Sequence, residues 1–215
     1  MTPAVAQAES AQWQAVVHRG KRLEILTVAW NSVEAVIGLL AGLAAGSIAL
    51  VGFGLDSVIE VSSGVVLLWR LRAAQQAGRG ERAERIALRL VGVSFLALAA
   101  YVAADAVWSL LRQEVPEESR IGMALAVLSL IVMPLLARAK RRVAARLGSA
   151  ALRADSRQTD ICAYLSAILL GGLLLNAWLG WWWADPVAAL AMVPLIAGEG
   201  IEAVQGKTCG DMVCT

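Results

Sequence analysis

Charged residues are scarce in this chain, and histidine is almost absent. Only 17% of its 215 residues are charged, 59% are hydrophobic, and the mean hydropathy is +0.66. So little charge excludes an ordinary soluble globular domain and predicts a polytopic membrane protein. The sequence also contains no HExxH-like motif and no recognisable pair of nucleophile and base, so we do not expect a membrane enzyme. The single histidine, His18, is most simply a surface residue.

A cleavable signal peptide is also missing. The segment from Met1 to His18 is polar and lacks a basic start followed by an apolar run. We therefore expect residues 1–22 to form a cytoplasmic N-terminal tail or a surface helix.

Six apolar segments are long enough to cross a hydrocarbon core of about 30 Å. They leave almost no residues for a soluble domain, so the predicted fold is all-α, a six-helix transmembrane bundle over residues 23–206 with a short tail at 207–215. The expected spans are residues 23–44, 47–69, 86–111, 121–137, 155–179 and 186–204.

Positive charge is distributed very unevenly between the two sides of such a bundle. Of the 19 basic residues, 17 lie on one side: they precede the first span, follow the last, lie between spans two and three or four and five, or, for Arg89 and Arg157, lie in the first turn of spans three and five. Only Arg112 and Arg120 fall on the opposite side. Because Lys and Arg are retained in the cytoplasm, both termini are predicted to be cytoplasmic in a multi-pass protein of the cell membrane. The basic loops would contact anionic lipid, and we expect no nucleic-acid partner.

The three cysteines, Cys162, Cys209 and Cys214, lie in the membrane or on its cytoplasmic side in this topology, where a structural disulfide is improbable. We expect free thiols. Cys209 and Cys214 could capture a soft metal ion, although a nonspecific thiol pair is the simpler interpretation.

Small residues and one Asp-Pro pair predict local structure. Gly38, Gly42 and Gly46 form a small-residue ridge on the first span, which allows close helix approach in lipid. The turn near Gly46 is so short that the first two spans must form an antiparallel hairpin. Asp185 followed by Pro186 predicts an N-cap and first turn for the last span.

Two carboxylates, Asp56 and Glu60, interrupt the apolar sequence of the second span. Residues four apart lie one turn apart on the same helix face, so both side chains would point the same way. A charge at that depth costs roughly 2.5 to 3.5 kcal/mol on insertion scales, which makes an idle one improbable. The pair indicates a cation site.

The fifth span offers the other half of such a site. If spans two and five face each other, Asp160 would join Asp56 and Glu60, with Ser156 or a water as the fourth group. Ser156 and Asp160 share a helix face, whereas Asp155 lies about 140° from Asp160. Cys162 follows the Asp155 face.

Glu34, halfway along the first span, is a further candidate ligand or a protonated structural donor. The competing hypothesis is that these acids only pair with basic groups or with each other to hold the helices together. We expect no Lys or Arg deep in any span to serve as such a partner.

Opposed carboxylates repel one another when no ion is bound, so protons should occupy a vacant site. Metal entry would then displace protons, and proton entry would displace metal. This competition couples the two fluxes if the helices expose the site to each side in turn.

Three stretches resemble the transmembrane domain of the cation diffusion facilitator family, proton-coupled exporters of zinc and related divalent metals. Gly46-Ser47 with the Asp56–Glu60 pair is similar to that family's second helix. The run from Arg153 to Asp160 is similar to its fifth, with Asp160 matching the motif's closing aspartate. Ala184 to Leu190 and Glu202 to Gln205 resemble its sixth.

This resemblance implies a secondary transporter that exports a divalent metal ion by proton antiport. It also implies that the protein forms a homodimer and holds no tightly bound cofactor. Two features depart from the family pattern. Ser156 replaces the usual His or Asp and Glu60 stands for the commoner Asp, which leaves oxygen ligands and keeps Zn²⁺, Mn²⁺ and Fe²⁺ all open. We also expect the family's C-terminal cytoplasmic domain to be lacking. The alternative is a nontransporting membrane metal sensor or assembly subunit.

Overall fold

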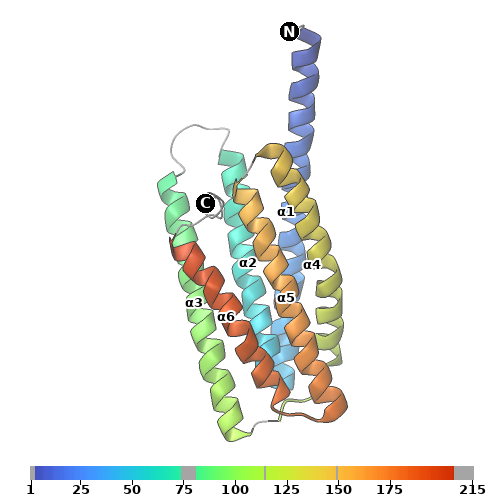
Figure 1. Cartoon of the computed structure of the whole chain (residues 1–215), viewed down its shortest axis with the longest axis vertical. Coiled ribbons are helices and arrows are strands. Elements are labelled where there is room, and N and C mark those ends of the chain that lie inside the picture. Colours follow the sequence, from blue (N-terminus) through green and yellow to red (C-terminus); the bar gives the residue numbers. More distant parts are fainter. Residues whose placement is uncertain (1–2, 74–80, 114, 149, 206–215) are drawn as a thin grey trace, which may run out of the picture.

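The computed structural model describes residues 3–73, 81–113, 115–148 and 150–205, and within these ranges it contains six α-helices and no strand (Figure 1). Each helix has an apolar segment long enough to cross a bilayer. The expected all-α, six-span fold of a multi-pass membrane protein is confirmed. The helices are α1 (Pro3–Ala45), α2 (Ile48–Ala73), α3 (Glu81–Arg112), α4 (Arg120–Leu147), α5 (Ala150–Leu179) and α6 (Ala184–Gln205).

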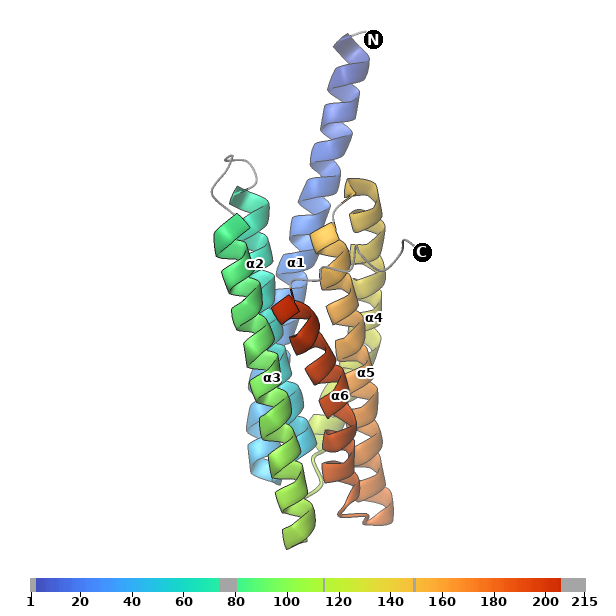
Figure 2. The same cartoon turned by 60° about the vertical axis from the view of Figure 1, so that its left-hand side comes forward.

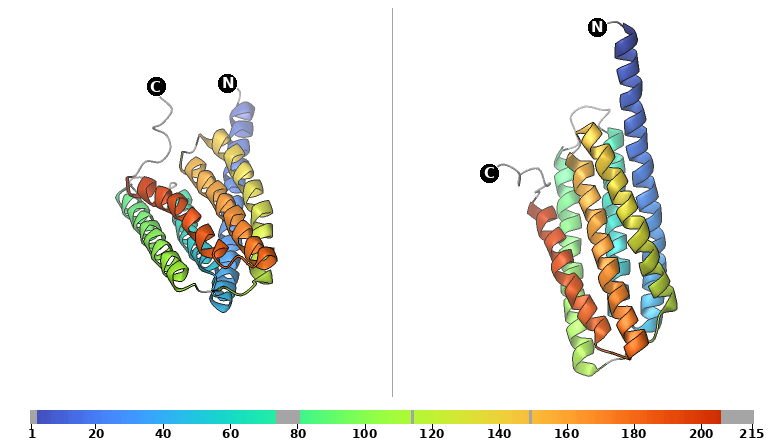
Figure 3. Two further views of the ribbon diagram at one scale, coloured as in Figure 1. Left: turned by 60° about the horizontal axis from the view of Figure 1, so that its bottom comes forward. Right: turned by 45° about the vertical axis from the view of Figure 1, so that its right-hand side comes forward.

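Two helices extend well beyond the apolar runs that predicted them. α1 begins at Pro3, and its first turns project past the rest of the bundle (Figure 3, right). α4 continues from the predicted end at residue 137 to Leu147. Basic residues end the apolar run there, but Lys140, Val143 and Ala144 are buried, so packing continues the helix past the point at which hydropathy alone would end it.

The helices form a closed ring in the order α1, α2, α3, α6, α5, α4, because each of these neighbours is in contact. α6 lies between α3 and α5 (Figure 2). Inside the ring, α2 also contacts α5 and α6. The predicted α1–α2 hairpin and the facing of α2 and α5 are therefore confirmed. The start of α1 and the end of α6 lie toward the same end of the bundle, here called the terminal end (Figure 1).

Glycines bring α1 and α2 into close contact, as the small-residue ridge predicted. A Cβ added at Gly38 would lie 3.2 Å from the Cα of Gly54, and one at Gly42 would lie 2.8 Å from the backbone nitrogen of Val51. Gly46 has another role, since its φ of 64° makes the tight turn into α2.

Asp185 does not act as the N-cap of its own helix, contrary to the expectation from Asp185-Pro186. Its carboxylate accepts hydrogen bonds from the Ser47 hydroxyl at 2.5 Å and from the backbone nitrogens of Ile48 at 2.9 Å and Ala49 at 3.4 Å. These are orphan donors at the start of α2. Asp185 therefore caps α2 across the bundle and ties the start of α6 to the α1–α2 turn.

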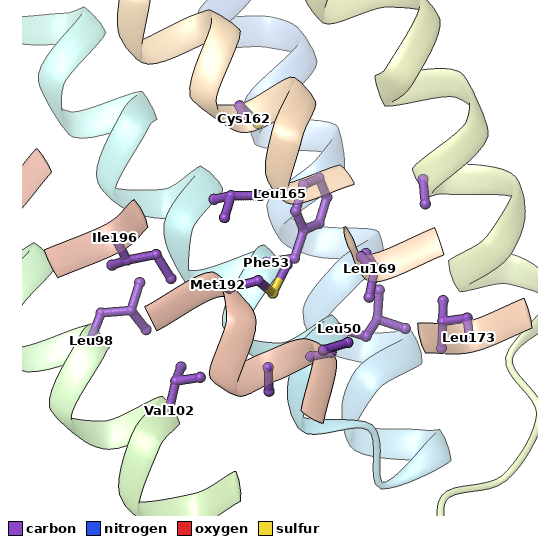
Figure 4. Close-up of a cluster of buried hydrophobic side chains, with 14 of the residues drawn as sticks. Leu50, Phe53, Leu98, Val102, Cys162, Leu165, Leu169, Leu173, Met192 and Ile196 are labelled. Atoms are coloured by element: carbon purple, nitrogen blue, oxygen red, sulfur yellow. The ribbon is translucent and has the colours of Figure 1, made fainter. Parts of the chain in front are cut away.

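The half of the bundle away from the terminal end, here called the distal half, has a mainly apolar interior (Figure 4). Leu50 and Phe53 of α2 are fully buried there, as are Leu169 of α5 and Met192 of α6. Cys162 lies at the edge of this cluster nearest the terminal end (Figure 4). Apolar packing thus reaches as far as the turn of α2 that carries Asp56.

Candidate metal centre

Asp56, Glu60 and Cys162 come together between α2 and α5. One ligand atom from each side chain lies within 4.8 Å of the other two, and all three side chains are buried. The two carboxylates share one face of α2 because they are four residues apart, as the sequence predicted. Cys162 reaches the same point from α5 and is a free thiol. The sequence hypothesis did not include it as a ligand, although its common face with Asp155 was apparent.

α1 supplies a polar wall to this centre. The side-chain amide of Asn31 donates to Oε2 of Glu60 at 2.5 Å. Glu34 is completely buried, and its Oε1 accepts a hydrogen bond from the Trp30 ring nitrogen at 2.6 Å. Glu34 also lies close enough to Asp56 and Glu60 for the three carboxylates to interact electrostatically. The bundle therefore concentrates negative charge at this depth.

No Lys or Arg within the described ranges forms an ion pair with Asp56 or Glu60. Two ionised carboxylates in a buried apolar setting repel each other, and only a cation or a proton relieves that repulsion. Carboxylate oxygen binds most divalent metals, and a thiolate adds a soft ligand that favours zinc. The arrangement is chemically suited to a small divalent cation.

The structure does not bring the α5 candidates Asp160, Asp155 and Ser156 into this three-residue group. Asp160 forms an ion pair with Arg141 of α4. Asp155 accepts from the Lys140 ammonium at 2.5 Å. The Ser156 hydroxyl is buried and donates to the carbonyl of Arg153 in the preceding turn. Their roles as ligands stay predictions.

The expectation that no Lys or Arg in a span would serve as a partner of the candidate acids is wrong for Asp155 and Asp160, which pair with Lys140 and Arg141 of α4. Lys140 is fully buried, and its ammonium contacts Glu24 of α1 at 3.0 Å as well as Asp155. The apolar run of the fourth span ends at residue 137, which placed Lys140 in a loop. In the folded chain α4 continues and turns this side chain inward.

Fold and site together define a polytopic membrane protein with a candidate divalent-metal centre between two of its helices. The family model of the cation efflux transmembrane domain matches residues 25–204. The chain therefore belongs to the cation efflux family.

Several curated proteins are similar over most of this chain. An uncharacterized transporter of Synechocystis sp. is 30% identical over 168 residues, which cover 74% of this chain and 54% of that protein. Transmembrane protein 163 of Xenopus laevis is 27% identical over 84% of this chain and 66% of its own length. The cation-efflux pump FieF of Salmonella agona is 25% identical over 86% and 64%. The chain thus spans between about half and two thirds of the length of these relatives.

Proposed function

We propose that this chain exports a divalent metal ion from the cytoplasm and that Asp56 and Glu60 are its core ligands. The observation that carries the proposal is the buried group of two carboxylates and one thiol, which has no basic partner among the described residues. Membership of the cation efflux family and the similarity to a cation-efflux pump of Salmonella support it. In the proposed topology, the basic loops place the terminal end of the bundle on the cytoplasmic side of the cell membrane.

Cys162 is the third ligand in the proposed metal-bound state. A thiolate beside two carboxylates favours Zn²⁺ over Mn²⁺, while Fe²⁺ falls between them. Asp160 is the alternative third ligand, and it would have to leave Arg141 and turn toward α2. In either case the bound ion would have no direct contact with the three other candidates, and they would lie around the site: Ser156, Asp155 and Glu34.

Proton antiport is the proposed source of energy. Without metal, Asp56 and Glu60 relieve their mutual repulsion by holding protons, so each arriving ion releases them. Alternating access to the two sides then makes the inward proton flux drive metal out.

The test is flux into proteoliposomes that contain a metal-sensitive dye or a pH-sensitive dye, with Zn²⁺, Mn²⁺, Fe²⁺, Co²⁺ or Cd²⁺ outside. We expect saturable Zn²⁺ entry with proton release, and at least a 100-fold loss of flux in Asp56→Asn. The matched control is Asp105→Asn on α3, outside the proposed site, which should transport normally. Metal binding without flux in the wild type would instead support the nontransporting sensor.

Asp160→Asn and Cys162→Ala separate the two candidates for the third ligand. If Cys162 is the ligand, Cys162→Ala should raise the Kd for Zn²⁺ while Asp160→Asn leaves it unchanged. The reverse result would assign the role to Asp160.

A further inference from the structure

A second group of ionisable side chains, largely buried, lies near the proposed metal centre. Lys140 of α4 places its ammonium 3.0 Å from Oε2 of Glu24 and 2.5 Å from Oδ2 of Asp155, and 3.5 Å from the Thr159 hydroxyl. Glu24 is 1% exposed and Lys140 is completely buried. We call Glu24, Lys140 and Asp155 the triad. It joins α1, α4 and α5 around a single positive charge.

The triad lies on the terminal side of the metal centre. α2 runs from the distal half toward the terminal end, and Gly64 follows Glu60 by one helical turn on the same face. A Cβ added at Gly64 would lie 2.7 Å from Oε1 of Glu24, so the carboxylate of Glu24 rests against α2 there. The rise along α2 from Glu60 to that contact is about 6 Å. Glu60 is also within electrostatic range of Lys140 and Asp155.

The triad has more ligand atoms than its one cation uses. Oε1 of Glu24 is buried and accepts no hydrogen bond within the described part of the chain. Two carboxylates face one ammonium, which leaves one negative charge in excess when all three groups are ionised. Two carboxylates and a hydroxyl are hard oxygen ligands of the kind that bind Mn²⁺ and similar divalent ions.

We propose that Glu24 and Asp155 form a second divalent-cation site on the cytoplasmic side of the metal centre and that the Lys140 ammonium fills this site until an ion arrives. The inference rests on the proposed function for its direction, since an exported ion would reach the triad before Asp56 and Glu60. Between transport cycles the Lys140 ammonium balances the negative charge of Glu24 and Asp155. When a divalent ion binds, the ion replaces the ammonium between the two carboxylates.

The neighbouring ion pair shows why a purely structural role does not fit the triad. Arg141 and Asp160 pair one to one, with their side chains 43% and 28% exposed. In that pair each charge is balanced by the other. The pair is partly exposed, and an exposed ion pair contributes little to stability. In the triad, Glu24 and Lys140 are buried, Asp155 is 14% exposed, and two acids face one base. A buried ionic group with an unused carboxylate oxygen is a poor way to hold helices together.

Mn²⁺ binding to the purified full chain tests the second site directly. In an Asp56→Asn/Glu60→Gln background, which silences the metal centre, we expect Lys140→Gln to bind one additional Mn²⁺ per chain by electron paramagnetic resonance. Its Kd should be at least tenfold lower than with Lys140 present. Adding Glu24→Gln and Asp155→Asn should abolish this binding. The matched control is Arg141→Gln, which frees Asp160 in the same way and should bind no additional ion.

Absence of the additional ion in folded Lys140→Gln would overturn the proposal, and so would an additional ion that survives the loss of Glu24 and Asp155. An equal gain in Arg141→Gln would do the same. Binding needs no transport, so absent flux would overturn the proposed function and leave the second site standing.

If Lys140→Gln does not fold, Glu24→Gln and Asp155→Asn decide the question, because each keeps one ion pair intact. The KM for Zn²⁺ on the terminal side should rise at least fivefold in both variants at an unchanged kcat. An unchanged KM in both would overturn the second site.

Discussion

The two halves of the bundle are built on the same helices but differ in how many ionisable side chains they bury. In the distal half, Leu50 and Phe53 of α2 pack against Leu169 and Met192 from α5 and α6. One turn further along the inner face of α2, the buried residues become Asp56 and then Glu60. From there to the terminal end the interior combines charged and polar side chains from α1, α4 and α5 with a smaller apolar cluster that contains Val143, Ala144 and Leu152.

This contrast assigns different physical tasks to the two halves. The distal half holds the helices together mainly by close packing, and its buried carboxylate, Asp185, already accepts hydrogen bonds from Ser47 and from the backbone at the start of α2. The polar half keeps carboxylates buried, which is unfavourable unless a cation, a proton or a basic side chain compensates them. Lys140 forms ion pairs with Glu24 and Asp155, whereas no Lys or Arg of the described residues forms an ion pair with Asp56 or Glu60. The difference supports the proposal that a mobile cation binds at Asp56 and Glu60.

Lys140→Met should give the largest loss of stability. It leaves two buried carboxylates without their cation, and breaking a buried pair in this way costs about 3 to 5 kcal/mol. Thermal unfolding in detergent, followed by circular dichroism, measures the effect. The control Arg141→Met removes an exposed charge and should change stability by less than about 1 kcal/mol. Equal losses in the two variants would show that burial of the triad has no energetic consequence.

Phe53→Ala should come next, with a loss of about 3 kcal/mol, because it opens a cavity in the apolar half. Metal binding at Asp56 and Glu60 should persist, since no ligand is removed. Val58→Ala on the exposed face of α2 is the matched control and should unfold like the wild type. A loss of metal binding in folded Phe53→Ala would mean that the two halves are coupled and that the comparison between them fails.

Cys162→Ser tests the boundary between the halves. Replacing a soft sulfur ligand by a hydroxyl should lower the preference for Zn²⁺ over Mn²⁺ by about tenfold, or about 1.4 kcal/mol. The readout is the ratio of the two Kd values in competition titrations. If the ratio is unchanged, the Cys162 thiol does not coordinate the ion and is only a part of the apolar core.

Ser166→Ala should have the smallest effect. The Ser166 and Ser129 hydroxyls are hydrogen-bonded at 2.8 Å between α5 and α4, both fully buried. Losing one such bond costs about 1 kcal/mol. A shift in unfolding temperature with unchanged Zn²⁺ binding would make this a structural contact only. A large change in Zn²⁺ affinity would extend the metal centre toward the distal half.

Much of this organisation follows from sequence patterns that are local. The apolar runs predict all six helices, and the four-residue spacing of Asp56 and Glu60 predicts their common face. The short turn at Gly46 predicts the α1–α2 hairpin. Each of these features depends on the period of one helix or the length of one loop, so neighbouring residues contain the necessary information.

Contacts between residues that are distant in the sequence were harder to predict. Asp185 was expected to cap α6 but caps α2, because a carboxylate serves whichever orphan backbone donors the fold brings to it. Lys140 was placed in a loop by its charge, although α4 continues and pairs it with Glu24. Hydropathy measures the cost of burying one side chain by itself. It contains no information on an ion-pair partner that lowers this cost, such as Glu24 for Lys140.

The sequence by itself determined a six-span helical protein with two carboxylates on one face of its second helix. Only the tertiary structure decided what faces them: Cys162 beside the pair, Asp160 held by Arg141, and Asp155 held with Glu24 by Lys140. The physical reason is that these contacts depend on the rotation and depth of each helix relative to its neighbours. Packing of the whole bundle sets both quantities, and no single segment encodes them.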